Sequence, residues 1–413
     1  MTLQLAVILV PVLFGMMGFA IDLGRLYLIR GELNQAANAM ALAAAAQLVG
    51  TSASLDNATA VAIQSLDNTN HLANKYNFGS LAIDPAAITP AFFATVADAT
   101  GASGTPADGT TARHVQISVT ADAPLLFWSM LPVGMSRKTA VSSQAVAGIS
   151  APLCTACGIQ PFAIAAPDST DPVNFGFGDP AAGTLYTFAF ECIATPGGPT
   201  PIVAPPTLTG AVVQYVIINR YDTANTTLDE TQQLYKDGAQ GLVASPNPKL
   251  TGSPLIPLAC VGIGDAETIW ASAAPSACAT IIAPNASVSA ALCGLYSRLD
   301  NTSLPAACST FADLSAAYLP DTDLLTGEAY TSYIGNGRRI ITVPVVTASM
   351  TVLGFRQFLL EPGFLNPADT YGRFVVQYIG SPAPVQQGWF DDHFGLGCPI
   401  PVASGPGKVV LHR

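Results

Sequence analysis

An uncharged apolar segment at the N-terminus constrains this chain more than any other feature. Residues 2–21 read TLQLAVILVPVLFGMMGFAI and contain no charged side chain. At 1.5 Å per residue, about twenty helical residues span about 30 Å, the thickness of the hydrocarbon core of a bilayer. A helical pattern continues to Val49, so the sequence predicts one long helix whose first half crosses a membrane and whose second half emerges from it.

A cleaved signal peptide is the alternative interpretation of the same segment. The apolar core of a signal peptide is typically about 7–15 residues long and ends at a small-residue cleavage site. The apolar run here is longer, and no A-x-A site interrupts the helix before the alanine-rich sequence begins. We therefore expect a permanent anchor.

Small residues along this helix indicate close packing. Small side chains let transmembrane helices approach closely, and the residues expected to form this packing face are Gly15, Gly18, Ala20 and Gly24. An alanine-rich stretch follows, with high helix propensity and little bulk, which could pack on the chain's own domain or on identical helices. Asp22 and Arg25 are three residues apart, a spacing that predicts an ion pair at the membrane edge.

The composition is that of an exported protein rather than a cytosolic enzyme. Half of the 413 residues are apolar and only 10% are charged, well below the roughly 25% of ordinary soluble proteins. Lys and Arg total 16 against 27 Asp and Glu, a net charge of −11 without a basic patch. We expect no nucleic-acid partner.

Cysteines point to an oxidising compartment. All of them follow residue 150, and an even number after a membrane anchor predicts disulfides whose pairing the sequence leaves open. The eight candidates are Cys154, Cys157, Cys192, Cys260, Cys278, Cys293, Cys308 and Cys398. Arg25 and Arg30, which follow the apolar run, favour the opposite topology by the positive-inside rule. We give the cysteines more weight and expect the body of the protein outside the cytoplasm.

The sequence predicts an α+β fold in three regions. Residues 1–50 form the long helix, and residues 51–150 form a small pilin-like region with a second helix and an antiparallel sheet. In that sheet, residues 114–121 alternate apolar and polar side chains, an apolar bend reading LLFWSMLPVG follows, and residues 136–148 form the next strand. Residues 151–413 form a mostly β, disulfide-stapled domain with a Cys-rich insertion at about 255–320, and three strongly β segments between residues 338 and 380 predict a meander.

The CxxC motif at Cys154 and Cys157 admits three interpretations. A thioredoxin-like redox site requires the motif at the start of a helix, but a β-like stretch follows it here. A zinc knuckle requires a second pair of ligands, and the four histidines are scattered. Structural disulfides are the interpretation we favour.

Candidate catalytic and binding residues are few. Asp391, Asp392 and His393 could ligate a metal or act as an acid–base cluster, although a polar loop is the simpler interpretation. Residues 168–179 are acidic and glycine-rich, but their spacing departs from that of a calcium-binding EF-hand loop. The common catalytic and nucleotide-binding motifs are absent from the sequence. We expect a non-enzymatic protein without a cofactor or a metal.

The N-terminal pattern resembles a known family. The order Ala20, Asp22, Gly24, Arg25, Tyr27, followed by Asn34 and the alanine-rich run, is similar to the signature of TadG-like (TadE/TadG-like) proteins of bacterial Tad (Flp) pilus systems. The order of segments from RRIITVPVV to YGRFVV resembles the carboxyl end of the same family. The resemblance implies a single-pass protein of the bacterial inner membrane, with its C-terminal domain periplasmic or extracellular. It also implies a role in pilus assembly and surface attachment, with the lipid bilayer and other pilus subunits, or copies of itself, as partners.

Two further functions stay open at this point. A membrane-anchored adhesin independent of a pilus would bind through surface aromatic residues of the second domain, for which the candidates are Trp270, Trp389, Tyr371 and Phe390. An anchored extracytoplasmic enzyme would use Asp391, Asp392 and His393.

Overall fold

The computed structural model divides the chain into two compact units. It describes residues 2–65, 88–101, 104–127, 138–157, 159–160, 162–190, 206–217, 261–264, 286–300, 305–308, 320–385, 387–389 and 404–412. The first unit comprises Met1–Leu48, Ser54–Ile149 and Val410–Arg413, and the second comprises Val49–Ala53 and Ser150–Val409. Helices and sheets occur together in an α+β chain, as predicted.

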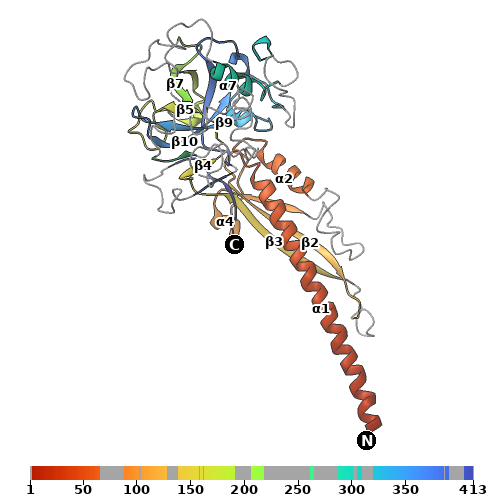
Figure 1. The fold of residues 1–413 in the computed structure, drawn as a ribbon. Helices are drawn as coiled ribbons and strands as arrows, with labels where there is room; N and C mark the ends of the chain where they lie inside the picture. Colours follow the sequence, from red (N-terminus) through yellow and green to blue (C-terminus); the bar gives the residue numbers. More distant parts are fainter. Residues whose placement is uncertain are drawn as a thin grey trace. The chain divides into compact units, whose positions relative to one another are not determined.

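The first unit has one long helix packed on a sheet in which β1, β2 and β3 are antiparallel (Figure 1). Its elements are α1 (Thr2–Ala45), α2 (Ser54–Gln64), β1 (Thr89–Phe93), α4 (Val96–Thr100), β2 (His114–Pro124), β3 (Lys138–Ile149) and β13 (Val409–His412). The strands lie in the order β1-β2-β3-β13, and β2 pairs with β3 from His114↔Gly148 to Pro124↔Lys138. Strands β2 and β3 therefore form a long antiparallel hairpin, and both correspond to strands that the sequence predicted.

Helix α1 buries one face from its middle onward. The buried side chains recur every three or four residues, the spacing of one helical face, and they are Ile29, Leu33, Ala37, Met40, Ala44 and Leu48. Strand β2 supplies the opposing surface with Val115, Ile117 and Val119, all fully buried, while Gln116 points to the other face and donates to the carbonyl of Ala99 in α4. The N-terminal part of α1 extends beyond the hairpin (Figure 1).

Helix α1 ends earlier than the sequence predicted. We expected helix to Val49, but it ends at Ala45, and the N–H groups of Gln47 and Leu48 donate to carbonyls three residues back. This tighter bonding is the usual way in which a helix ends. Gly50 then adopts a positive φ of 81°, a conformation that glycine reaches without steric cost.

Strands dominate the second unit, and some of them close into a barrel. The elements of this unit are β4 (Thr155–Cys157), β5 (Phe162–Ala165), β6 (Leu185–Phe190), β7 (Ala211–Ile217), β8 (Val261–Gly262), α7 (Ala286–Tyr296), β9 (Ile340–Val346), β10 (Val352–Leu360), β11 (Phe374–Gly380) and β12 (Gln387–Trp389), with short 3₁₀ turns between them. The barrel order is β10-β11-β6-β7-β5-β9, and a small sheet has the order β12-β4-β8. The predicted meander is present as β9-β10-β11, but the parallel pairings β5–β9 and β6–β7 that close the barrel were not predicted.

Aromatic side chains fill the barrel. Phe188 and Phe358 lie with their ring centroids 5.0 Å apart in an edge-to-face arrangement, one of several such pairs. The apolar face of α7 joins this core through Val288, Leu292 and Leu295. Most of the predicted Cys-rich insertion lies outside the described residues, but within it Cys293 and Cys308 form a disulfide.

Candidate functional site on the N-terminal helix

Asp22 fastens Leu126 and Phe127, the two residues that we call the hairpin end, to helix α1. Its side chain is buried, with 6% of the residue's surface exposed. One carboxylate oxygen accepts from the backbone N–H of Leu126 at 2.9 Å, and the other accepts from the N–H of Phe127 at 3.0 Å. Hydrogen bonds to a carboxylate are stronger than those between neutral groups. The two bonds therefore offset the free-energy cost of burying the Asp22 charge, and they fix the position of the hairpin end.

Gly18 lies one helical turn before Asp22 and permits the same contact. A Cβ placed on Gly18 would come within 2.8 Å of Cβ and Cγ of Phe127, closer than carbon atoms approach. Only glycine lets the Phe127 ring lie this close to the helix backbone. Of the residues predicted to form a packing face, Gly18 therefore packs on the chain's own hairpin.

The other residues predicted to form the packing face have no neighbouring side chain or are exposed. A Cβ on Gly15 or on Gly24 would meet no atom within 4 Å, and the same holds for Gly31. Ala20 is exposed. Because Gly24 and Gly31 are seven residues apart, they lie on the same side of the helix, away from the buried row that includes Asp22 and Ile29. The predicted pair of Asp22 with Arg25 stays a prediction.

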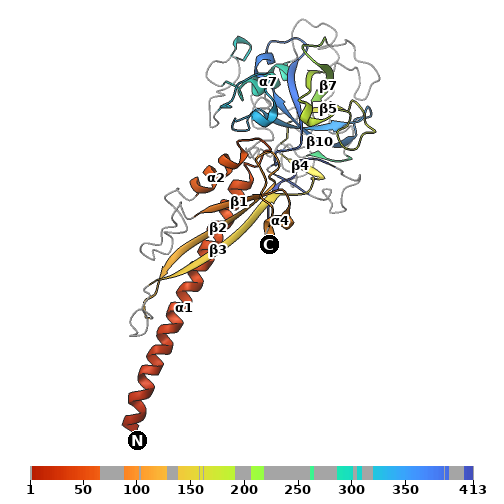
Figure 2. The same ribbon diagram turned by 180° about the vertical axis from the view of Figure 1, so that it is seen from behind.

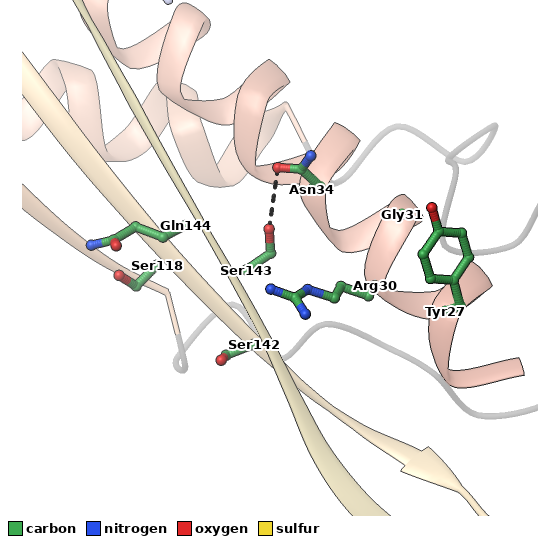
Figure 3. A pocket seen from close by; sticks show the side chains of 8 residues that line it. All are labelled: Tyr27, Arg30, Gly31, Asn34, Ser118, Ser142, Ser143 and Gln144. Carbon is green, nitrogen blue, oxygen red and sulfur yellow. Dashed lines mark hydrogen bonds between the residues drawn. The ribbon is translucent and has the colours of Figure 1, made fainter. Parts of the chain in front are cut away.

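A polar groove lies between α1 and the β2–β3 hairpin, with a volume of ≈ 650 Å³. Its eight lining residues are Tyr27, Arg30, Gly31, Asn34, Ser118, Ser142, Ser143 and Gln144. The Arg30 side chain extends from the helix toward β3, and the Ser143 hydroxyl donates to the Asn34 side-chain oxygen at 3.4 Å (Figure 3). The lining is neutral or basic, so its hydroxyl, amide and guanidinium groups suit a polar or anionic partner group.

The residues on this helix also carry the family signature. Residues 1–47 match the Tad family model, described as "Putative Flp pilus-assembly TadE/G-like". The chain carries a TadE/G-like N-terminal segment. This confirms the resemblance that the motif from Ala20 to Tyr27 indicated. No curated protein and no solved structure matches the chain significantly.

The TadE/G-like segment coincides with a candidate membrane span. Among the described residues, one helix is long and apolar enough to cross a membrane, with its candidate span at Val12–Ala45. Its first part presents large apolar side chains to the surroundings, including Phe14, Met16 and Met17 at 66%, 67% and 59% exposure. Within the TadE/G-like segment, Gly18 and Asp22 hold the hairpin, whereas Tyr27, Arg30 and Asn34 line the groove.

The remaining sequence-predicted candidates are only partly described. Asp391, Asp392, His393, Phe390 and Trp270 lie outside the described residues, and for Trp389 the structure describes the backbone in β12. Tyr371 lies under the guanidinium of Arg373, with 5.1 Å from Cζ to the ring centroid.

In the acidic segment 168–179, the aspartates Asp168 and Asp171 stabilise turns of the backbone. Asp168 accepts from the N–H and the hydroxyl of Thr170, and the hydroxyl bond above all lowers the pKa of the Asp168 carboxyl. Asp171 accepts from the N–H groups of Val173, Asn174 and Gly176. In the described part of the chain, no three His, Cys, Asp or Glu residues are grouped so that they could hold a metal ion.

The CxxC motif lies on a strand. Cys157 is the last residue of β4, a strand of the small sheet β12-β4-β8, and Cys154 directly precedes that strand. Cys154 is disulfide-bonded. A thioredoxin-like site would place the motif at the start of a helix. This placement agrees with a structural disulfide.

Sequence reasoning missed the contact of Asp22 with the hairpin. It assigned Asp22 to a local pair because Arg25 lies at helical spacing, whereas the hairpin end is more than a hundred residues away in the chain. The apolar bend that begins at Leu125 was visible, and an apolar turn after a long strand could have suggested a contact with the apolar part of the helix.

Proposed function

We propose that the protein is a single-pass, membrane-anchored component of a Tad (Flp) pilus system, acting through protein–protein packing in pilus assembly and surface attachment. The observation that carries this proposal is the match of residues 1–47 to the TadE/G-like family, over the one described helix long enough to span a bilayer. A helix packed on an antiparallel hairpin, as in a pilin-like subunit, agrees with this role.

The surface of α1 offers two places for a partner subunit. The open side at Gly24 would let another helix approach closely, because small residues reduce the distance between helix axes. We place the polar groove around Arg30 on the part of the helix that emerges from the membrane, because the uncharged run ends at Ile21. We propose that partner subunits of the pilus, or further copies of this chain, contact these surfaces.

We place the second unit in the periplasm or outside the cell. The Cys293–Cys308 disulfide supports an oxidising compartment, since cytosolic thiols are kept reduced. We propose further that the protein is not an enzyme and needs no cofactor. The substitutions Asp392→Asn and His393→Ala test this, because both should leave pilus assembly and folding at wild-type levels.

Fractionation of cells tests the proposal directly. A tag at the carboxyl end would be followed through inner membrane, periplasm and sheared surface filaments, with non-reducing gels on each fraction. Full-length, disulfide-bonded protein in the sheared fraction would make it a minor pilin or tip subunit, and retention in the inner membrane would make it an assembly factor. Reduced protein that external protease cannot reach in spheroplasts would contradict the topology and the pilus role with it.

A membrane-anchored adhesin independent of a pilus is the second candidate. It predicts normal pilus assembly together with lost adhesion when exposed aromatic residues of the second unit are removed. Loss of assembly in helix variants such as Gly24→Leu would favour the pilus component instead.

A further inference from the structure

We propose that the end of the β2–β3 hairpin is a second membrane contact, in which Leu126 and Phe127 enter the lipid interface beside helix α1. The partner of this surface is the bilayer itself. The inference rests on α1 spanning the membrane, as in the proposed function, and adds a contact that the family match does not describe.

The depth of the hairpin end follows from its contact with the helix. Phe127 lies against Gly18, and Gly18 belongs to the uncharged run that ends at Ile21. Three residues of helix rise about 4.5 Å. When residues 2–21 occupy the hydrocarbon core, Phe127 is therefore placed about 4.5 Å below the level at which the apolar run of the helix ends.

The side chains at the hairpin end suit lipid. Leu126 and Phe127 are 48% and 40% exposed, and the neighbouring helix surface also exposes Met17, Phe19 and Ile21. Leucine and phenylalanine are among the side chains that insert into a bilayer most favourably. Phe127 therefore adds apolar side-chain surface at the level of Gly18, within the apolar part of the helix.

The backbone N–H groups at the hairpin end are already hydrogen-bonded, as a low-dielectric environment requires. Backbone N–H groups that enter lipid without a partner are costly, because no water is present to bond them. The N–H groups of Leu126 and Phe127 both donate to Asp22, whose carboxylate is itself buried. These two N–H groups and the Asp22 carboxylate are thus hydrogen-bonded to one another.

The charge next to the hairpin end fits a lipid headgroup. Lys138 begins β3 directly opposite Pro124 and is exposed. In a chain with a net charge of −11, a cation at this place suits the phosphates of the bilayer surface. The hairpin would then fix how deeply α1 is inserted in the bilayer.

Photo-crosslinking in membranes tests the inference. The full-length chain would be made with p-benzoyl-L-phenylalanine at one of three positions and reconstituted into phosphatidylethanolamine–phosphatidylglycerol vesicles. Position 126 tests the hairpin end, position 14 reports on the exposed apolar part of α1, and position 120 is an exposed site on β2 about 20 Å farther along the strand at 3.3 Å per residue. We expect a mass increase of one phospholipid at positions 14 and 126, and none at position 120.

The outcomes separate this inference from the proposed function. Lipid adducts at position 14 together with only protein adducts at 126 would show that a second chain covers the hairpin end and would overturn the inference. Adducts at 14 with none at 126 would overturn it as well. Failure at position 14 would remove the membrane anchor itself, and the proposed function and the inference would fall together.

Discussion

Asp22 and Phe127 are joined across more than a hundred residues by one hydrogen bond, from the Phe127 N–H to an Asp22 carboxylate oxygen at 3.0 Å. The bond gives the acidic residue of the TadE/G-like signature a structural role. With the matching bond from Leu126 and the space left by Gly18, it fastens the hairpin to helix α1, beside which β2 and β3 run (Figure 2). The signature therefore specifies tertiary packing within the first unit.

Replacing Asp22 by asparagine should loosen the hairpin end. The amide replaces one of the two acceptor oxygens by an NH2 group, which only donates, so the same geometry keeps one of the two bonds. A hydrogen bond to a charged group contributes about 1.5–3 kcal/mol. We expect faster hydrogen exchange at the amides of Leu126 and Phe127 in D22N, measured by mass spectrometry in detergent. Asp122→Asn on the exposed side of β2 is the matched control. Equal exchange in both variants would contradict the role of Asp22.

Gly18 and Gly24 should respond differently to the same substitution. Gly18→Ala places a Cβ within 2.8 Å of Phe127 and should displace the hairpin end, whereas Gly24→Ala meets no atom of the chain. We expect hydrogen exchange at Phe127 to rise in G18A and to stay at the wild-type level in G24A.

The larger variant Gly24→Leu then isolates the contact with partners. Because the position is open, the isolated chain should fold normally while filament assembly, measured in the sheared surface fraction, is lost. Normal assembly in G24L would contradict the proposed partner contact at Gly24.

The elements with strong local patterns could be predicted from the sequence. The apolar helix, the alternating strand at Val115, Ile117 and Val119, and the meander β9-β10-β11 follow from the spacing of apolar side chains. The barrel closure could not be predicted, since the parallel pair of β5 with β9 joins residues such as Ile164 and Val345 that no local pattern relates.

The candidate site was predictable in its residues but not in their contacts. Gly18 and Asp22 were identified as special because of their type and position on an apolar helix. The contacts of Gly18 and Asp22 depend on where the hairpin packs along the helix. That packing joins residues more than a hundred positions apart and leaves no local pattern in a single sequence. The C-terminal strand β13 was missed for a related reason, because it pairs in a sheet whose other strands precede residue 150.

The Cys293–Cys308 disulfide should be isolated as a linked peptide pair. The bond closes a loop with a sequence separation of 15, and a loop of about this length contributes about 3 kcal/mol in the chain-entropy model. We expect the double variant Cys293→Ser/Cys308→Ser to unfold at a lower denaturant concentration, and mass spectrometry without reduction to show the two peptides joined. Both cysteines appearing as free thiols in protein from the membrane fraction would contradict the pairing and the oxidising location.

His114 should make the first unit sensitive to mild acid. It is buried beside His412, with ring centroids 5.1 Å apart. Burial, with smaller effects from His412 and Arg113, lowers its pKa from 6.5 to about 4. The folded state therefore prefers neutral His114, so its contribution to stability is complete above pH 6.5 and is lost as the pH falls toward 4.

The substitution His114→Asn removes this titration and tests it. The thermal midpoint of the wild-type protein should fall between pH 6.5 and pH 4.5 by more than that of H114N, even if the variant is less stable at pH 7.5. Carboxylates elsewhere titrate equally in both proteins, so the comparison isolates His114. Parallel pH profiles of the two proteins would contradict the prediction.

Removing the buried cation Arg339 should cost more than removing a surface cation. Its guanidinium lies 3.8 Å from Asp323 and 3.8 Å from Glu361 at 1% side-chain exposure, and burial raises the pKa of the Glu361 carboxyl. Arg339→Met leaves two buried carboxylates without their cation, which typically costs about 3–5 kcal/mol. Arg373→Met removes a more exposed pair with Asp369 and should shift the denaturant midpoint less. Adding Glu361→Gln to R339M should recover part of the loss, because it removes an uncompensated charge, and a double variant no more stable than R339M would contradict the assignment of the cost to that charge.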